Sequence, residues 1–153
     1  MEFQSIEDII DFAIQSEVEA ADFYQAASEN ETIRGVAKNL QEYAEEERKH
    51  EQMLKNFKEN SEKMAAYQFE KIQDIKRSDY LVEMEYRPGM SYVNVMRVAM
   101  KREEQAFKLY GRMAEATDNA DYAKLFQILA QEEAKHKNYF ETLYDDYMAT
   151  QGD

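Results

Sequence analysis

The chain has 153 residues, a length that suits one domain with a sizeable core. Its 32 acidic and 19 basic residues leave a net charge of −13, which argues against binding to a phosphate backbone, because such binding relies on Lys and Arg. The absence of cysteine excludes disulfides, iron–sulfur clusters and cysteine-ligated metal sites in this chain.

Long helices are expected, because one proline and four glycines provide few chain breaks. The sequence contains no apolar run of about 18 residues, and its acidic N-terminus lacks the pattern of a signal peptide. We therefore expect a protein that neither enters a membrane nor binds nucleic acid, with the cytoplasm as its default location.

A first helix can begin at Ser5, an N-cap candidate with Asp8 three residues later. Apolar residues then recur at intervals of three and four, the pattern of a core-facing helix. Glu17 interrupts this apolar face, seven residues before Tyr24. The other residues of the face are Ile6, Ile9, Ile10, Ala13, Ala20 and Ala27.

A second helix is predicted after the turn at 29–32, and its apolar face contains Glu47 and His50 one turn apart. The first helix pair is expected at 5–66. The remaining residues of the second apolar face are Val36, Leu40, Tyr43, Ala44, Leu54 and Phe57.

An irregular crossover is expected at about 69–90, ending in Arg87-Pro88-Gly89. A helix of 20 residues is about 30 Å long, whereas an extended chain covers about 3.3 Å per residue. The crossover can therefore run the length of a bundle. Its large apolar side chains are expected to pack over the bundle or in a dimer contact, and they are Tyr80, Leu81, Val82 and Tyr86.

A second helix pair is expected at 91–149, within a single domain of 1–153. Ser91 is the N-cap candidate of the third helix, whose apolar face contains Glu103 and, seven residues later, Tyr110. The fourth helix presents Glu133 and His136 one turn apart on its apolar face.

The two helix pairs repeat one pattern at an offset of 86 residues. A comparison without gaps of 34–54 with 120–140 gives eight identities in 21 positions, whereas composition alone would give roughly one or two. Duplication, or a strong constraint toward one geometry, explains this agreement. The matching positions are Glu17 and Glu103, Tyr24 and Tyr110, Glu47 and Glu133, and His50 and His136.

These repeated polar residues have the chemistry of a two-metal site. Residues at i and i+3 share a helix face, so each Glu-x-x-His can point at one metal ion. An unpaired ionised carboxylate in an apolar core costs several kcal/mol, and nearby basic residues fall on other helix faces. Two divalent ions would balance four carboxylates, and this ligand type suits iron or manganese, with zinc as a substitute. The predicted ligands are Glu17, Glu47, His50, Glu103, Glu133 and His136, and the basic residues placed on other faces are Lys38, Lys49, Lys101, Arg102 and Lys135.

Two further pairs of residues lie close to the predicted ligands, and each pair has more than one possible role. Glu46 and Glu132 precede the histidines by four residues. We interpret them as solvated surface or as residues that contact a ligand, with metal ligation as the alternative. Tyr24 and Tyr110 either are core tyrosines with one hydrogen bond or orient a ligand carboxylate.

In this order the motifs resemble the rubrerythrin-like di-iron proteins of the ferritin-like superfamily. They are Glu17-x6-Tyr24, Glu47-x-x-His50, Glu103-x6-Tyr110 and Glu133-x-x-His136. The resemblance implies an all-α four-helix bundle of two hairpins joined by a long crossover, with two iron ions as cofactor. It also implies that Glu47 and Glu133 bridge the irons. Glu17 with His50 would then complete one iron, and Glu103 with His136 the other.

The sequence departs from the rubrerythrin pattern in two respects. Rubrerythrins usually carry a rubredoxin-like domain with four cysteines, whereas this chain has no cysteine. They also have an additional glutamate at the position of Ala106, so a symmetric six-ligand site nearer to bacterioferritin is expected here. Ferritin cages commonly need a fifth short helix or particular cage contacts, which are not visible, so we expect a homodimer.

Three functions are open to such a chain. The favoured one is an oxidoreductase that reduces hydrogen peroxide or dioxygen, with electrons from a separate rubredoxin or flavoprotein. The second is a ferroxidase or iron-handling protein, which oxidises Fe(II) and passes Fe(III) onward. The third is a non-catalytic interaction module whose bundle is stapled by metal.

Overall fold

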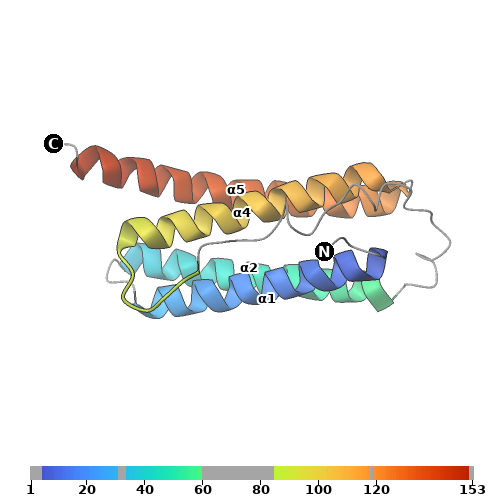
Figure 1. The fold of residues 1–153 in the computed structure, drawn as a ribbon, viewed down its shortest axis with the longest axis horizontal. Coiled ribbons are helices and arrows are strands. Elements are labelled where there is room, and N and C mark those ends of the chain that lie inside the picture. Colours follow the sequence, from blue (N-terminus) through green and yellow to red (C-terminus); the bar gives the residue numbers. More distant parts are fainter. Residues whose placement is uncertain (1–4, 31–33, 60–84, 118, 152–153) are drawn as a thin grey trace.

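The computed structural model describes residues 5–30, 34–59, 85–117 and 119–151. Four helices make up almost all of these residues (Figure 1), and the described residues contain no strand. The helices are α1 (Ile6–Asn30), α2 (Arg34–Glu59), α4 (Tyr92–Ala116) and α5 (Ala120–Gln151).

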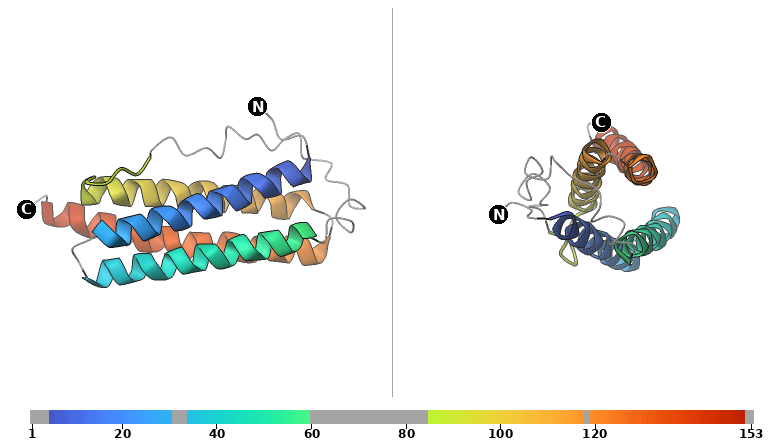
Figure 2. Two further views of the ribbon diagram at one scale, coloured as in Figure 1. Left: turned by 90° about the horizontal axis from the view of Figure 1, so that it is seen from below. Right: turned by 90° about the vertical axis from the view of Figure 1, so that its right-hand side faces the viewer.

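The helices form two antiparallel hairpins, α1 with α2 and α4 with α5, and α1 lies against α4 (Figures 1 and 2). The end of α2 and the start of α4 lie at opposite ends of the bundle. The prediction of an all-α, ferritin-like four-helix bundle is therefore confirmed. The predicted helical stretch 60–66 and most of the predicted crossover, with Tyr80, Leu81 and Val82, lie outside the described residues.

Side-chain caps fix where three of the helices begin. The Ser5 hydroxyl accepts a hydrogen bond from the backbone N–H of Asp8 (3.1 Å), and the Ser91 hydroxyl accepts one from that of Asn94 (3.2 Å). Both caps were predicted from the sequence. The Asn119 side chain caps α5 in the same way, with a bond of 3.0 Å to the N–H three residues later. Each cap satisfies an N–H group that has no partner within its helix.

The core consists of two apolar clusters. The first contains Ile9, Ile10, Ala13, Leu54, Phe57, Leu109, Tyr110, Met113, Ala116, Phe126, Leu129 and Ala130. The second contains Ala20, Phe23, Tyr24, Ala27, Val36, Leu40, Ala44, Val95, Met96, Val98, Ala99 and Phe140. Along α1 the first cluster ends at Ala13 and the second begins at Ala20, so Glu17 lies between them. The two clusters therefore leave a polar layer in the middle of the bundle.

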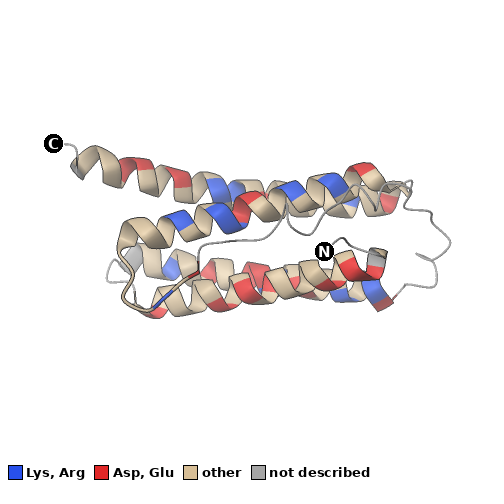
Figure 3. Ribbon diagram, viewed as in Figure 1, with Lys and Arg blue, Asp and Glu red and all other residues tan. Residues whose placement is uncertain are grey.

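Charged residues occur along all four helices (Figure 3). In the described part of the chain, no helix is both long and apolar enough to cross a membrane. A few large apolar side chains are also exposed, namely Phe107, Ile128 and Met148.

Replacing Phe126 by alanine is expected to destabilise the fold far more than replacing Phe107. Phe126 is fully buried in the first cluster, whereas Phe107 is 43% exposed on α4. Loss of a buried phenylalanine ring costs about 3–5 kcal/mol, and an exposed substitution usually costs less than about 0.5 kcal/mol. Urea denaturation measures both changes in the free energy of unfolding. Equal losses in the two variants would contradict the assignment of the core.

Candidate metal centre

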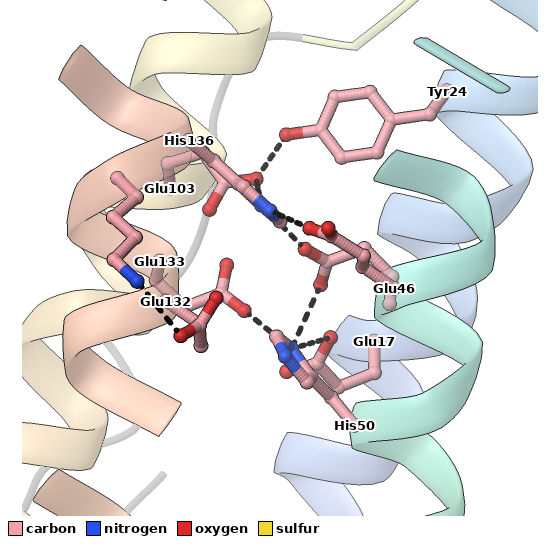
Figure 4. Close-up of polar contacts among 10 residues, drawn as sticks. Glu17, Tyr24, Glu46, His50, Glu103, Glu132, Glu133 and His136 are labelled. Carbon is pink, nitrogen blue, oxygen red and sulfur yellow. Dashed lines mark hydrogen bonds and ion pairs between the residues drawn. The ribbon is translucent and has the colours of Figure 1, made fainter. Parts of the chain in front are cut away.

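Six ligand-type side chains fill the polar layer of the bundle (Figure 4). All of them are buried, with no more than 6% of any residue exposed. They are Glu17 from α1, Glu47 and His50 from α2, Glu103 from α4, and Glu133 and His136 from α5. The structure therefore brings together every residue that the sequence predicted as a ligand.

The six residues form two overlapping groups that share two glutamates. In each group the candidate ligand atoms lie within 4.8 Å of one another. Glu47 and Glu133 belong to both groups, as expected for carboxylates that bridge two metal positions. One group is completed by Glu17 and His50, and the other by Glu103 and His136.

Each histidine contacts the shared glutamate of the other hairpin. His50 Nδ1 lies 2.7 Å from the carboxylate of Glu133, and His136 Nδ1 lies 3.0 Å from that of Glu47. Both rings thus turn Nδ1 toward the centre. Because the four residues exchange partners between α2 and α5, the repeat seen in the sequence becomes an approximate two-fold symmetry of the site.

Two buried tyrosines make the corresponding exchange between α1 and α4. The Tyr24 hydroxyl donates a hydrogen bond to Glu103, and the Tyr110 hydroxyl donates one to Glu17. Burial and the neighbouring carboxylates raise the pKa of both phenols, so both remain protonated donors. In each of these glutamates, Oε1 accepts the tyrosine bond and Oε2 is buried without a hydrogen-bond partner.

Burial dominates the electrostatics of the two shared glutamates. It raises the pKa of Glu47 and of Glu133 well above the usual range, and the charges of the neighbouring glutamates raise both values further. Glu17 behaves differently. Burial would raise its pKa too, but the contacts with Glu47 and His50 and the hydrogen bond from Tyr110 lower it below the usual value.

The histidines take up protons in response to this negative surrounding. Burial alone would lower the pKa of His136, but its contacts with Glu103, Glu133 and Glu46 together outweigh that effect and raise the pKa to about 9. The carboxylates beside His50 raise its pKa as well. Without a cation, the centre therefore compensates its carboxylates with protons.

The donor set fits two metal ions. Each of the six residues contributes a buried atom with no hydrogen-bond partner among the described residues, since the close histidine–glutamate contacts lack hydrogen-bond geometry. Buried unpaired polar atoms are rare in folded proteins and call for a bound partner. A set of carboxylate oxygens and imidazole nitrogens favours iron or manganese over metals that prefer sulfur ligands. The atoms are Glu17 Oε2, Glu47 Oε1, His50 Nδ1, Glu103 Oε2, Glu133 Oε1 and His136 Nδ1.

A cavity of about 470 Å³ extends along α1 and α4 and reaches the centre. Its lining includes the four central glutamates but neither histidine, so the histidines close the α2–α5 side. The cavity was not foreseen from the sequence, although small residues on the facing helices were a signal for it. These residues are Ala13, Ser16, Ala20, Ala26 and Ala106.

Arg102, which was predicted to lie on another face than the apolar one, is partly buried beside the cavity. Its side chain is only 16% exposed, lines the cavity and lies 3.8 Å from the carboxylate of Glu19. The guanidinium also packs over the ring of Phe23, 5.6 Å from its centroid. Its long aliphatic stem lets a residue beside the apolar face reach the neighbouring helix α1.

The metal-free protein is expected to lose stability as the pH rises from about 5 to about 9. Glu47, Glu133 and His136 have higher pKa values in the fold than in an unfolded chain, so the folded state binds more protons in this window. The contribution of His136 is complete below about pH 6.5 and is lost as the pH passes about 9.

Urea denaturation of the metal-free protein across this pH range measures how its free energy of unfolding changes with pH. Metal-loaded protein is the control, and its slope should be smaller because bound cations keep the ligands deprotonated. A free energy of unfolding that increases with pH in the metal-free protein would show that the charge balance is wrong.

Comparison with known proteins places the chain in a family. The family model for rubrerythrin matches residues 8–144. A candidate ferritin-like diiron-carboxylate protein from Thermotoga maritima superposes with a TM-score of 0.78 at 19% identity, over 96% of this chain and 99% of that one. A hypothetical protein from Pyrococcus furiosus superposes with a TM-score of 0.73 at 24% identity, over 92% of this chain and 89% of that one.

No match is found among curated proteins. The two solved structures share the fold with this chain, and at such low identities they say no more than that. The family model is more specific, because it covers most of the sequence, including all six residues of the centre. The chain belongs to the rubrerythrin family.

Proposed function

We propose that the chain is an oxidoreductase that holds two iron ions at this centre and reduces hydrogen peroxide or dioxygen to water. The observation that carries the proposal is the pair of overlapping ligand groups with Glu47 and Glu133 in common. Two iron ions bound there would supply two electrons to one O–O bond. Manganese or zinc would occupy the same ligands as substitutes.

The residues around the centre support this chemistry by fixing the ligands. Glu47 and Glu133 would bridge the two ions, and the hydroxyls of Tyr24 and Tyr110 hold the outer oxygens of the remaining glutamates. Apolar clusters on both sides keep bulk water out of the bundle. The cavity along α1 and α4 gives a small oxidant a route to the carboxylate side of the centre.

The electron balance requires a partner. Reduction of one hydrogen peroxide to two waters consumes two electrons and two protons, and reduction of one dioxygen to two waters consumes four of each, so the two iron ions would have to be reduced again by the donor. This chain has no cysteine and so contains no rubredoxin-type iron site. We therefore propose an external donor, such as a rubredoxin or a flavoprotein, and a homodimer as the working assembly.

Replacing Glu47 by alanine is expected to abolish two-iron binding and peroxide turnover. Glu47 belongs to both ligand groups, so its loss affects both metal positions. Metal is first removed from the parent protein with a chelator, which is then washed out. Anaerobic Fe(II) titration of this metal-free protein should saturate at about two ions per chain. Peroxide consumption is then followed with a reductase and rubredoxin as the electron supply.

The matched control is Glu45→Ala, because Glu45 lies two residues earlier on α2 and is exposed. Helical circular dichroism should persist in both variants, and only Glu47→Ala should lose iron and turnover. Iron uptake far beyond two ions, together with a large assembly in light scattering, would point instead to iron handling. Strong stabilisation by metal without any turnover would indicate a structural staple.

Filling the cavity is expected to slow reoxidation of the iron-loaded protein without reducing its iron content. In Ala106→Leu, the larger side chain would occupy the space between α1 and α4. The second-order rate constant with peroxide should fall by about tenfold, which corresponds to about 1.4 kcal/mol in activation free energy. Stopped-flow absorption measures this rate.

Ala114→Leu is the control for this experiment. Ala114 lies on the same helix and packs against the same apolar cluster as Ala106, but it does not line the cavity. If both leucine variants react with peroxide at the same rate, the cavity is not the route to the centre.

A further inference from the structure

The two histidines occupy equivalent positions in the repeat, but their outer nitrogens have different surroundings. His136 turns Nδ1 toward the centre, and its Nε2 contacts the carboxylate of Glu46, which comes from α2 (Figure 4). Glu46 itself is no ligand candidate, since its side chain is 42% exposed. It therefore bonds to the ring nitrogen on the side away from the centre.

The repeat predicts the same contact for His50, but the structure does not have it. Glu132 is the counterpart of Glu46, because 132 − 46 = 86. Its carboxylate pairs with Lys135 on its own helix, at 3.3 Å. No ion pair within 4.0 Å joins Glu132 to His50 among the described residues.

A second difference concerns the face of the imidazole ring. Tyr43 of α2 packs against His136, with 4.2 Å between the ring centroids and 32° between the planes. The counterpart of Tyr43 in the repeat is Leu129, since 129 − 43 = 86, so α5 offers no aromatic ring at the matching place. Two side chains of α2 thus hold His136 in its orientation, and neither has its equivalent at His50.

We propose that the two metal positions are unequal and that Glu46 is the positioning residue that makes the His136 position the tighter one. The proposal rests on the two-metal centre described above. A carboxylate that accepts the Nε2–H of a metal-bound histidine fixes the tautomer that leaves Nδ1 free to bind. The same hydrogen bond raises the basicity of the ligand nitrogen and prevents rotation of the ring.

This inequality has a consequence for loading. The first divalent ion binds at the position completed by Glu103 and His136, and the second binds more weakly at the position of Glu17 and His50. The weaker ion exchanges with solution and can be replaced by a different metal while the first stays in place. A centre with two different ions then becomes accessible from an almost symmetric ligand set.

Stepwise titration with Co(II) under anaerobic conditions tests the proposal, because its absorption reports each ion separately. The parent protein should bind two ions with clearly different dissociation constants. Glu46→Ala should weaken the tighter step by about 10- to 100-fold, the usual effect of losing such a partner of a metal-bound histidine. Glu46→Gln keeps an acceptor oxygen without the charge and should recover part of the affinity.

Glu132→Ala is the matched control from the other half of the repeat and should leave both binding steps unchanged. Circular dichroism confirms folding in all variants, which is expected because Glu46 and Glu132 are partly exposed. Nitrogen-15 NMR of the Zn(II)-loaded protein provides a readout that a purely structural role would not change. The chain has only two histidines, so only two sets of ring signals arise.

In the NMR experiment, one Nε2–H proton should exchange slowly and disappear in Glu46→Ala, while the other histidine is unaffected. Two equal dissociation constants in the parent protein, or equal effects of Glu46→Ala and Glu132→Ala, would overturn the inequality while the two-metal centre stands. Absence of Co(II) binding in the parent protein would instead overturn the metal centre itself.

Discussion

Four carboxylates in the apolar interior of a helical bundle are the constraint on which the rest of this structure depends. An isolated buried carboxylate costs several kcal/mol, so the polar layer opposes folding unless its charge is compensated. Without a cation, protons on the histidines and on the shared glutamates provide that compensation, as the raised pKa values of His136 and Glu133 indicate. The apolar clusters on either side supply the favourable burial that holds this layer in place.

Most contacts in the polar layer cross from one hairpin to the other. The tyrosine–glutamate bonds join α1 to α4, and the closest histidine–glutamate contacts join α2 to α5. Neither hairpin could satisfy its own ligands alone, so the centre also defines how the two halves dock. Metal binding and the association of the hairpins are therefore linked, because ions bound to ligands of both hairpins would strengthen the contact between the hairpins.

The sequence predicted this centre well because its information is local. Glu-x-x-His places two ligands on one helix face, and the shared offset of 86 residues identifies the partners. The residues that contact the ligands from outside depend instead on how the two hairpins pack together. The periodicity of a single helix carries no information about that packing. Periodicity therefore did not show that Arg102 reaches Glu19 of α1, left Glu46 undecided and gave no indication that Tyr43 packs against His136.

The ligand residues and the residues that line the cavity have different effects on the chemistry of this chain. Six candidate ligands form the centre, and the histidines close one side of it. The glutamates face the cavity, and Arg102 and Ala106 also line it. Rubrerythrins have an additional glutamate at the position of Ala106, whereas here a methyl group lines open space. A centre that lacks a further carboxylate at this position leaves room for an incoming ligand, so the residues that line the cavity would determine which molecules reach the six candidate ligands.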